Sequence, residues 1–526
     1  MSKAVRMAKG SAKGGFNLFL GVSLSTIISS LGVIILGNLL GEDKYGLYTI
    51  AFISPALIGL FRDWGINSAM IKYIAQYRSE DKTSEIRKFL ASGLIFELVL
   101  GTLLSIISFS LAGFLATNVF NRSGTETMIE IASVAILANA LVVASQSTFI
   151  GFERMGFNSF ILICQASLKV FLAVLFIFLG YSTLGAVLGH VVAALITSTF
   201  AIIIVYSIFY RKSYGSENGG LNLSRTLKTM LIYGLPLSVS TILAGFLTQF
   251  YSFLMVIYCS NSMIGNYSMA LNFSTLIAFF TTPIATVLFP AFSKLNPEKE
   301  METLRNVFQS SVKYAALLTV PVTLAIMVLS EPLVFTLFAG RFSYAPLFLT
   351  LIAIGYLYSG LGNLSLGSFL NGQGKTKVTM KLTLISMGIG LPLSLTLISA
   401  FGIVGLIATT LVAGVPSLAV GLWWIKRHFG ATIDWASSAR IFLASVVAAV
   451  ITYIIISQLN FHCWVELFVG GITFLMVYLV AAPLIRALDE DDINNLREMV
   501  SDLGPFSHLF NLPLNIMEKL LTIFTF

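Results

Sequence analysis

Charged side chains are scarce in this sequence. Asp, Glu, Lys and Arg together make up 11% of its 526 residues, whereas 56% are hydrophobic. Soluble domains carry about 25% charged residues, so the composition excludes an ordinary water-soluble globule. Apolar stretches recur through nearly the whole chain at the length, about 20 residues, that crosses the hydrocarbon core of a membrane. Because that core offers no water, each stretch must satisfy its own backbone hydrogen bonds, which indicates transmembrane helices.

Cysteine and histidine are also rare, and they form no recognisable site. The three cysteines have no short spacing, which indicates neither a metal site nor a disulfide framework; they are Cys164, Cys259 and Cys463. The four histidines form no His-Glu-x-x-His motif. Residues 372–376 resemble part of a phosphate-binding loop, but Phe369 stands where that loop needs a glycine. We expect no metal, no cofactor and no ATP hydrolysis, and leave a coupling ion open.

The apolar stretches predict fourteen transmembrane spans. The first begins near Phe16, behind four basic residues, and runs to Leu40, which is longer than the core of a cleaved signal peptide. The others are expected at 45–65, 89–115, 127–150, 158–180, 183–209, 231–257, 264–290, 313–338, 345–370, 378–399, 402–425, 440–458 and 464–485. An even number of spans places both termini on the same side of the membrane.

The distribution of Lys and Arg predicts which side that is. Alternate connections, counted from the N-terminus, carry 28 of these residues, whereas the opposite set carries only Lys44, Arg122 and Arg341. The positive-inside rule places the richer set, and with it both termini, in the cytoplasm. The net charge of +8 therefore reports orientation in the cell membrane, and we expect no nucleic-acid partner.

An internal repeat predicts the domain organisation. Residues 46–51, Gly-Leu-Tyr-Thr-Ile-Ala, match residues 265–270, Gly-Asn-Tyr-Ser-Met-Ala, at an offset of 219. We expect an all-α integral membrane protein with two six-helix lobes related by a pseudo-twofold axis along the membrane normal, followed by two further helices. The predicted boundaries are 1–215 and 216–430 for the lobes, 431–486 for spans 13 and 14, and 487–526 for a cytoplasmic or interfacial tail.

Polar residues within the spans are the candidate site. Lys169 lies at the midpoint of span 5, where an unpaired ammonium costs at least about 2.5–3.5 kcal/mol, so it should face water or an acidic partner. We expect a polar central cavity in which Lys169 attracts an anionic group. A buried Lys–Glu pair that holds helices together is the alternative, and interhelical hydrogen bonding is the alternative for the amides. The other candidates are Glu97, Asn139, Gln146, Gln165, His190, Gln249 and Asn272.

Three further segments are expected to lie outside the membrane spans. Residues 121–123, Asn-Arg-Ser, form a glycosylation sequon on a predicted outer loop, although such triplets are common by chance. Residues 489–492 form an acidic run that we interpret as solvated. The last segment, 505–526, is interrupted by Pro513 and is expected to lie along the cytoplasmic surface.

Three stretches resemble a known family, the Wzx-like polysaccharide-biosynthesis flippases of the multidrug/oligosaccharidyl-lipid/polysaccharide exporter superfamily. Residues 39–48 resemble its first-loop pattern, residues 63–69 its following Asp-Leu-Gly-Leu-Asn-x-Ala segment with Trp64 in place of Leu, and residues 149–154 its turn between spans 4 and 5. The matching motif residues are Tyr45, Gly46, Tyr48, Asp63, Gly65 and Asn67.

This resemblance implies a transporter rather than an enzyme. It implies a flippase that moves a polyprenyl-diphosphate-linked oligosaccharide to the outer leaflet by alternating access, with membrane lipids and glycosyltransferases or a polymerase of the same pathway as partners. Lys169 is compatible with a diphosphate, although this chain has fewer deep basic residues than the family's basic cavity implies. A cation-coupled multidrug exporter and a membrane glycan polymerase or glycosyltransferase are the alternatives.

Overall fold

The computed structural model describes residues 3–211, 222–459, 461–501 and 507–524. These residues are almost entirely helical, as membrane spans must be, because a helix satisfies its own backbone hydrogen bonds. The chain divides into two compact units, Met1–Ser268 and Met269–Phe526. The predicted lobe boundary at residue 215 concerns the internal repeat and stays a prediction.

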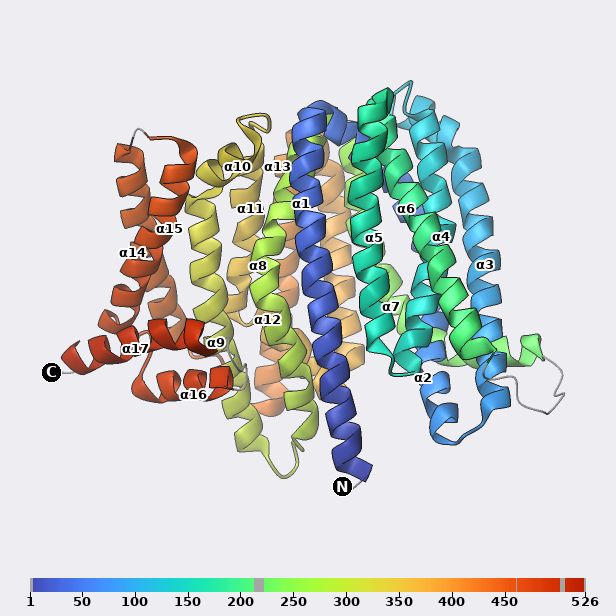
Figure 1. Ribbon diagram of the computed structural model, residues 1–526. Coiled ribbons are helices and arrows are strands. Elements are labelled where there is room, and N and C mark those ends of the chain that lie inside the picture. Colours follow the sequence, from blue (N-terminus) through green and yellow to red (C-terminus); the bar gives the residue numbers. More distant parts are fainter. Residues whose placement is uncertain (1–2, 212–221, 460, 502–506, 525–526) are drawn as a thin grey trace. The chain divides into compact units, whose positions relative to one another are not determined.

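The first unit is a bundle in which α1 contacts α4, α5 and α6, while α3 packs on α4 and α2 contacts α7 (Figure 1). Its helices are α1 (Lys3–Gly59), α2 (Ile66–Ser79), α3 (Thr83–Phe114), α4 (Glu126–Gly151), α5 (Met155–Phe176), α6 (Ser182–Ile204) and α7 (Leu223–Tyr258). A single π-helical turn extends each of α3, α5 and α6, at 115–119, 177–181 and 205–210. The next helix, α8 (Asn261–Lys294), begins in this unit and continues into the second.

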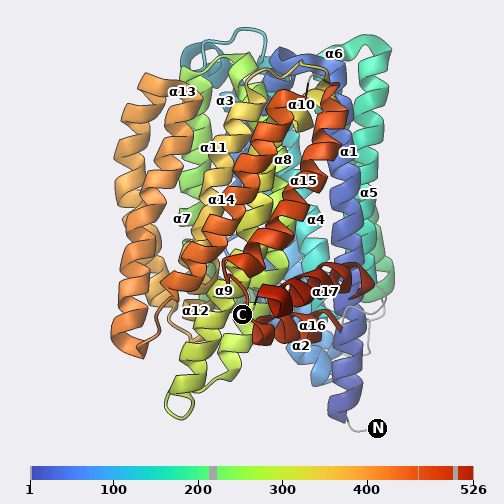
Figure 2. The ribbon, with the colours of Figure 1, turned by 90° about the vertical axis from the view of Figure 1, so that its left-hand side faces the viewer.

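The second unit contains nine helices in its described residues. They are α9 (Met301–Val328), α10 (Ser330–Phe338), α11 (Ala345–Leu357), α12 (Asn363–Gly372), α13 (Thr376–Phe429), α14 (Trp435–Gln458), α15 (Cys463–Leu484), α16 (Glu490–Ser501) and α17 (Ser507–Phe524). Helices α14 and α15 pack on each other and on α9 (Figure 2). One apolar core joins α9, α14 and α15 to the two tail helices, and another joins α9, α12 and α13.

The helices agree with the predicted spans except within 45–65, 313–338 and 345–370, where a helix ends before the predicted span does. Nine described stretches are long and apolar enough to cross a membrane, and α11 and α12 together form a further, bent one, with a 55° angle between them. Two of the nine, Met155–Tyr210 and Thr376–Phe429, have 56 and 54 residues and therefore hold two passes each. Helix α13 reverses at Gly402, which has non-helical backbone angles, and α1 breaks in the same way at Gly41. Predicted span 2 ends early, because α1 stops at Gly59 and α2 begins only at Ile66.

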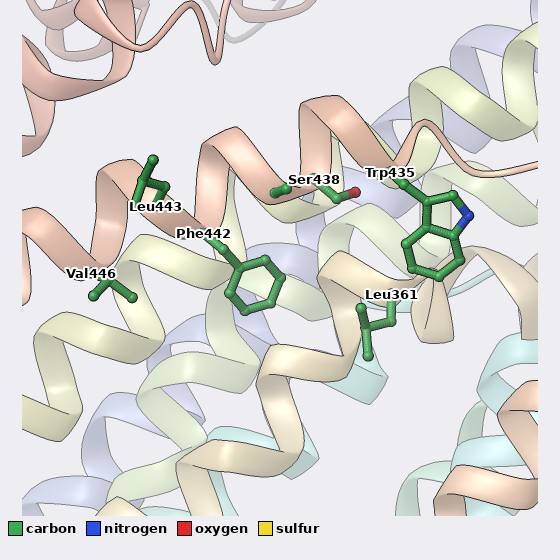
Figure 3. A pocket seen from close by; sticks show the side chains of 7 residues that line it. Leu361, Trp435, Ser438, Phe442, Leu443 and Val446 are labelled. Atoms are coloured by element: carbon green, nitrogen blue, oxygen red, sulfur yellow. The ribbon is translucent and has the colours of Figure 1, made fainter.

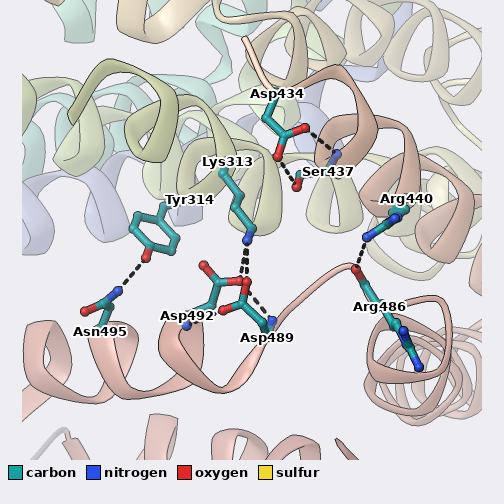
Figure 4. Close-up of polar contacts among 9 residues, drawn as sticks. All are labelled: Lys313, Tyr314, Asp434, Ser437, Arg440, Arg486, Asp489, Asp492 and Asn495. Carbon is teal, nitrogen blue, oxygen red and sulfur yellow. Dashed lines mark hydrogen bonds and ion pairs between the residues drawn. The ribbon is translucent and has the colours of Figure 1, made fainter. Parts of the chain in front are cut away.

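The tail helices are attached to the second unit, which corrects part of the sequence interpretation (Figure 4). Asp489 and Glu490 are solvated as predicted, but Asp492 is only 5% exposed, and the prediction was wrong for this residue. Asp492 forms an ion pair with Lys313 of α9, and Asp489 approaches the same ammonium at 3.3 Å. Apolar side chains of α17 join the core of α9, α14 and α15. The tail is thus held by both charge and burial.

Candidate functional site

The motif at residues 63–67 organises the break between α1 and α2. The Asp63 carboxylate accepts hydrogen bonds from the backbone nitrogens of Gly65, at 2.9 Å, and Asn67, at 3.5 Å, and so caps the first turn of α2. Gly65 has a φ of 81°, and a Cβ there would overlap the backbone of Gly234 in α7. Only glycine suits both conditions, so these motif residues position α2 against α7.

Glu97 belongs to this break rather than to an open polar site. Its fully buried carboxylate accepts a hydrogen bond from Asn67 Nδ2 at 2.7 Å and lies 3.4 Å from the Arg62 guanidinium. Ser147 of α4 donates to the Asn67 amide oxygen at 3.4 Å. The three side chains connect α3 and α4 to the start of α2. Sequence reasoning missed Arg62 as a partner because it counted this residue only as a loop cation.

A second polar group lies among α1, α5 and α6. The Tyr48 hydroxyl and His190 Nδ1 are 2.9 Å apart, and the imidazole also lies against Phe52, with ring centroids 4.3 Å apart. Lys169 of α5 is half-buried and near enough to His190 for its charge to act on the imidazole. The structure thus brings together two predicted site residues and one motif residue. The Tyr48–His190 contact carries no sequence signal, since 142 residues separate the two.

Amides continue this group along α4 and α5. Gln165 lies one helical turn before Lys169 on the same face of α5, and its Nε2 donates to Asn139 Oδ1 of α4 at 3.4 Å. Gln146 lies two turns beyond Asn139 on α4 and is half-buried. We call the row of Asn139, Gln165, Lys169, His190 and Tyr48 the polar ladder.

No carboxylate neutralises Lys169 in the ion pairs of the described residues, because Glu97 pairs with Arg62 instead. The alternative of a structural Lys–Glu pair within the first unit therefore loses its partner. A half-buried ammonium without a counter-ion is costly inside a membrane and favours an anion that arrives from outside the chain.

The two remaining amide candidates lie elsewhere. Gln249 is half-buried on α7, in the first unit, and Asn272 is half-buried on α8, in the second. Their participation in a binding site stays a prediction.

Tyr45 and Gly46 lie at the end of the first unit opposite the N-terminus, where α1 crosses α8. Tyr45 hydrogen-bonds to Ser268 of α8. A Cβ at Gly46 would overlap the Asn261 carbonyl, and a Cβ at Gly265 would overlap the Glu42 carbonyl. Gly46 and Gly265, like Glu42 and Asn261, are 219 residues apart, the offset of the internal repeat. Such reciprocal contacts arise where a twofold axis relates two copies of a segment.

A hollow of about 390 Å³ lies apart from the ladder, in the second unit (Figure 3). It is lined by Leu361 and one face of α14, whose side chains there are Trp435, Ser438, Ala439, Phe442, Leu443 and Val446. Ser438 and the indole nitrogen of Trp435 are the only polar side-chain groups among these residues, so the hollow offers mainly apolar contact and little to hold a sugar or a phosphate.

Comparison with known proteins identifies related sequences. The family model described as "Polysaccharide biosynthesis protein" matches residues 11–296, and the MatE model matches residues 236–396. The chain is 21% identical to the probable low-salt glycan biosynthesis flippase Agl15 of Haloferax volcanii, over 93% of this chain and 99% of that protein. It is 22% identical to the lipid II flippase MurJ of Bacillus subtilis, over 80% of this chain and 83% of that protein.

Solved structures show the same fold. The lipid II flippase MurJ in an inward closed conformation matches with a TM-score of 0.72 at 16% identity, covering 89% of this chain and 98% of that one. An inward-facing multidrug resistance MATE transporter matches with a TM-score of 0.63 at 17% identity, covering 79% and 98%. The chain is therefore an all-α, multi-pass membrane protein with the fourteen-helix, pseudo-twofold architecture, as the sequence predicted.

Proposed function

The chain belongs to the polysaccharide biosynthesis protein family, and on that premise we propose that it is a flippase for a lipid-linked oligosaccharide. The substrate is a polyprenyl-diphosphate-linked glycan, which moves from the cytoplasmic to the outer leaflet by alternating access. The relatives named as a probable glycan biosynthesis flippase and as a lipid II flippase support this proposal. Under the proposal the protein resides in the cell membrane with both termini in the cytoplasm.

The observation that carries the proposal is the polar ladder with its unneutralised ammonium. Lys169 offers a positive charge within α5, and Gln165 offers amide donors one turn away. Tyr48 and His190 supply further hydrogen-bonding groups from α1 and α6. A diphosphate presents negative charge and several acceptor oxygens, which match these donors. The sugar is recognised through hydrogen bonds, while the polyprenyl chain stays in the bilayer.

A cation-coupled multidrug exporter fits the first unit less well. Such a protein exchanges a cation for a cationic drug and needs an available carboxylate in its site. The candidate carboxylate, Glu97, is fully buried and paired with Arg62 and Asn67. The charge within α5, that of the half-buried Lys169, is positive and repels a cationic substrate.

A membrane glycan polymerase or glycosyltransferase fits less well for a different reason. It needs an extramembrane segment that carries catalytic carboxylates or a metal site. The predicted outer connections are short, for example residues 120–125 and 259–260. Partner glycosyltransferases or a polymerase, acting before or after the transfer, belong to our proposal as separate proteins. An ion gradient, or consumption of the delivered glycan, drives the transfer.

Transport assays in proteoliposomes test the proposal against the exporter alternative. The purified chain is reconstituted and given either a fluorescent polyprenyl-diphosphate oligosaccharide or ethidium, a cationic dye. We expect faster movement of the glycan head group than in protein-free vesicles, scored by protection from an impermeant quencher, and no protein-dependent ethidium movement. Ethidium transport without glycan transfer would establish the exporter instead.

A further inference from the structure

Three segments of the first unit meet at the end opposite the N-terminus, which is the outer end under the proposed orientation. They are the turn after Gly41, the loop 120–125, and the hairpin at 256–266 that joins α7 to α8. The first two belong to the first copy of the internal repeat and the hairpin to the second. The inference below rests on the proposed function, because it concerns how the outer end opens during transfer.

Arg122 fastens the loop to the hairpin. Its Nε donates to Asn261 Oδ1 at 2.7 Å, and its terminal nitrogens donate to the backbone carbonyls of Val256 and Cys259. These carbonyls belong to the last turn of α7 and its C-terminal cap, where helix carbonyls lack partners within the helix. A cation at a helix C-terminus also interacts favourably with the helix dipole. Phe120 adds an edge-to-face contact with Phe253, at 5.4 Å between ring centroids.

No carboxylate competes for this guanidinium, since none of the ion pairs in the described ranges includes Arg122. Arg122 donates instead to a side-chain amide oxygen and to backbone carbonyls. When the loop and the hairpin separate, water at the membrane surface can replace these neutral partners. The Arg122 guanidinium is then solvated. The Arg122 contact therefore differs from a buried ion pair, because breaking a buried ion pair leaves an uncompensated buried charge.

The turn after Gly41 contacts the same hairpin a short distance away. Glu42 Oε2 accepts a hydrogen bond from Asn266 Nδ2 at 2.7 Å. Beside it, Gly46 and Gly265 cross so closely that backbone meets backbone. Because glycine has no side chain, no side chains interdigitate where Gly46 and Gly265 cross. The two helices can therefore separate there without withdrawing a packed side chain. The reciprocal pairing around the 219-residue offset places this crossing where the two repeat copies meet.

We propose that Arg122, Glu42 and their partners on the α7–α8 hairpin form a releasable latch that closes the outer end of the transport pathway. The latch holds the first turn, the 120–125 loop and the hairpin together while the substrate is bound from the cytoplasm. It must open for release to the outer leaflet. The alternative is a permanent staple, meaning that the same contacts stay closed throughout the transport cycle. A latch and a staple predict opposite effects of locking these contacts on glycan transfer.

Thiol labelling tests the latch without a transport assay. Ile50 is fully buried, one turn below Gly46 on the same face of α1, so a cysteine there is shielded while the latch is closed. The parent carries Ile50→Cys with Cys164, Cys259 and Cys463 replaced by alanine, and the probe is an impermeant maleimide added outside. Arg122→Ala should raise the labelling rate about tenfold, because it removes charge-assisted hydrogen bonds that bias the closed state. An unchanged rate would overturn the latch.

Lys44→Ala is the matched control. Lys44 is exposed on the turn after Gly41, at the same outer end as Arg122. Lys44→Ala removes one positive charge, as Arg122→Ala does, and should leave the labelling rate unchanged. If both variants raise the rate alike, a general charge effect explains the result and the latch is wrong.

Cross-linking distinguishes a latch that opens during transport from a staple that stays closed. The Glu42→Cys, Asn266→Cys double variant, in the same cysteine-free background, is joined by a short bis-methanethiosulfonate linker that reducing agent removes. Glycan transfer should fall at least about tenfold on linking and recover on reduction, since one conformation of the cycle is blocked. Linked protein that transfers at the unlinked rate would show a permanent staple. If the intact protein transfers no glycan while Arg122→Ala still raises labelling, the proposed function fails and the latch stands.

Discussion

Lys169 is the residue on which this account depends most. It retains a charge halfway through a membrane helix, and the carboxylate predicted as its alternative partner, Glu97, is engaged by Arg62 and Asn67. A lysine with a structural role in the membrane would be expected to have a counter-ion within the chain. Without one, an apolar residue at this position would serve the fold equally well. The position is thus better explained by a ligand than by the stability of the fold.

This explanation predicts an unusual effect of Lys169→Met on stability. Methionine keeps most of the side-chain volume and removes a charge that costs about 2.5–3.5 kcal/mol at mid-membrane. The apparent midpoint of thermal unfolding in detergent should stay the same or rise. A clear drop would show that the ammonium has a structural partner within the chain, and Lys44→Met provides the exposed comparison.

Asp434 gives a prediction about pH. Its side chain precedes α14 and accepts hydrogen bonds from the Ser437 hydroxyl and from the backbone nitrogens of Ala436 and Ser437 (Figure 4). The bond from the Ser437 hydroxyl is the main cause that lowers the pKa of the Asp434 carboxyl below its usual value. A lowered folded-state pKa stabilises the fold above the unfolded value, about 3.9, and the contribution disappears as pH falls through the folded value.

Asp434→Ala should therefore destabilise the protein by about 0.5–2 kcal/mol at pH 7, the usual cost of a lost N-terminal cap. The difference between the two proteins should shrink as the pH is lowered below 4 (about the ordinary Asp pKa). Thermal unfolding in detergent from pH 7 to pH 3 measures this difference. A gap that widens on acidification would contradict the assignment of the cap.

At the scale of elements, the breaks between helices hold the motif residues. The segment between α1 and α2 brings Asn67 into contact with α3 and Gly65 into contact with α7, while Asp63 bonds to the start of α2. The motif thus fixes the angle at which α2 leaves the membrane helix. It was identified from sequence, but its structural role was not, because the partners of Gly65 and Asn67 on α7 and α3 lie 30 or more residues away along the chain.

Gly65→Ala tests this role directly. Alanine at a φ of 81° costs about 1–2 kcal/mol, and its Cβ would also overlap the backbone of Gly234. We expect the apparent unfolding midpoint in detergent to fall by at least about 1–2 °C, because a chain of this length has a large unfolding entropy. Gly113→Ala is the matched control, because a Cβ there meets nothing within 4 Å inside α3, and alanine should be neutral or stabilising. Equal midpoints for the two variants would refute the close approach.

At the scale of the whole molecule, apolar length predicted nearly all of the helices, because hydrocarbon leaves a chain little choice but to form them. The internal repeat was read from a six-residue match, and the reciprocal contacts of Gly46 and Gly265 support it. The breaks at Gly41 and Gly402 coincide with predicted connections. The breaks between α9 and α10 and between α11 and α12 were missed, since hydropathy does not register a bend inside an apolar stretch. The helical stretch after the last span was expected, but its attachment through Lys313 and Asp492 was not.

The candidate site could be predicted only in part, because hydropathy does not reveal tertiary contacts. Depth within a span identified Lys169 and its neighbours, since charge in a membrane is costly wherever it points. Depth alone did not separate the ladder from the Glu97 cluster, because both lie on apolar helices of similar pattern. That distinction required the pairing of α3 with the start of α2, which is a tertiary contact.

The central claim is that this chain carries the head group of a lipid-linked glycan past Lys169. The most direct measurement is the initial rate of head-group transfer in proteoliposomes containing equal amounts of intact protein, Lys169→Met, Lys169→Arg or Lys44→Met. Our account predicts rapid transfer by the intact protein and Lys44→Met, at least about a tenfold loss in Lys169→Met, and partial recovery in Lys169→Arg, which keeps the charge. Equal rates for the intact protein and Lys169→Met would contradict it.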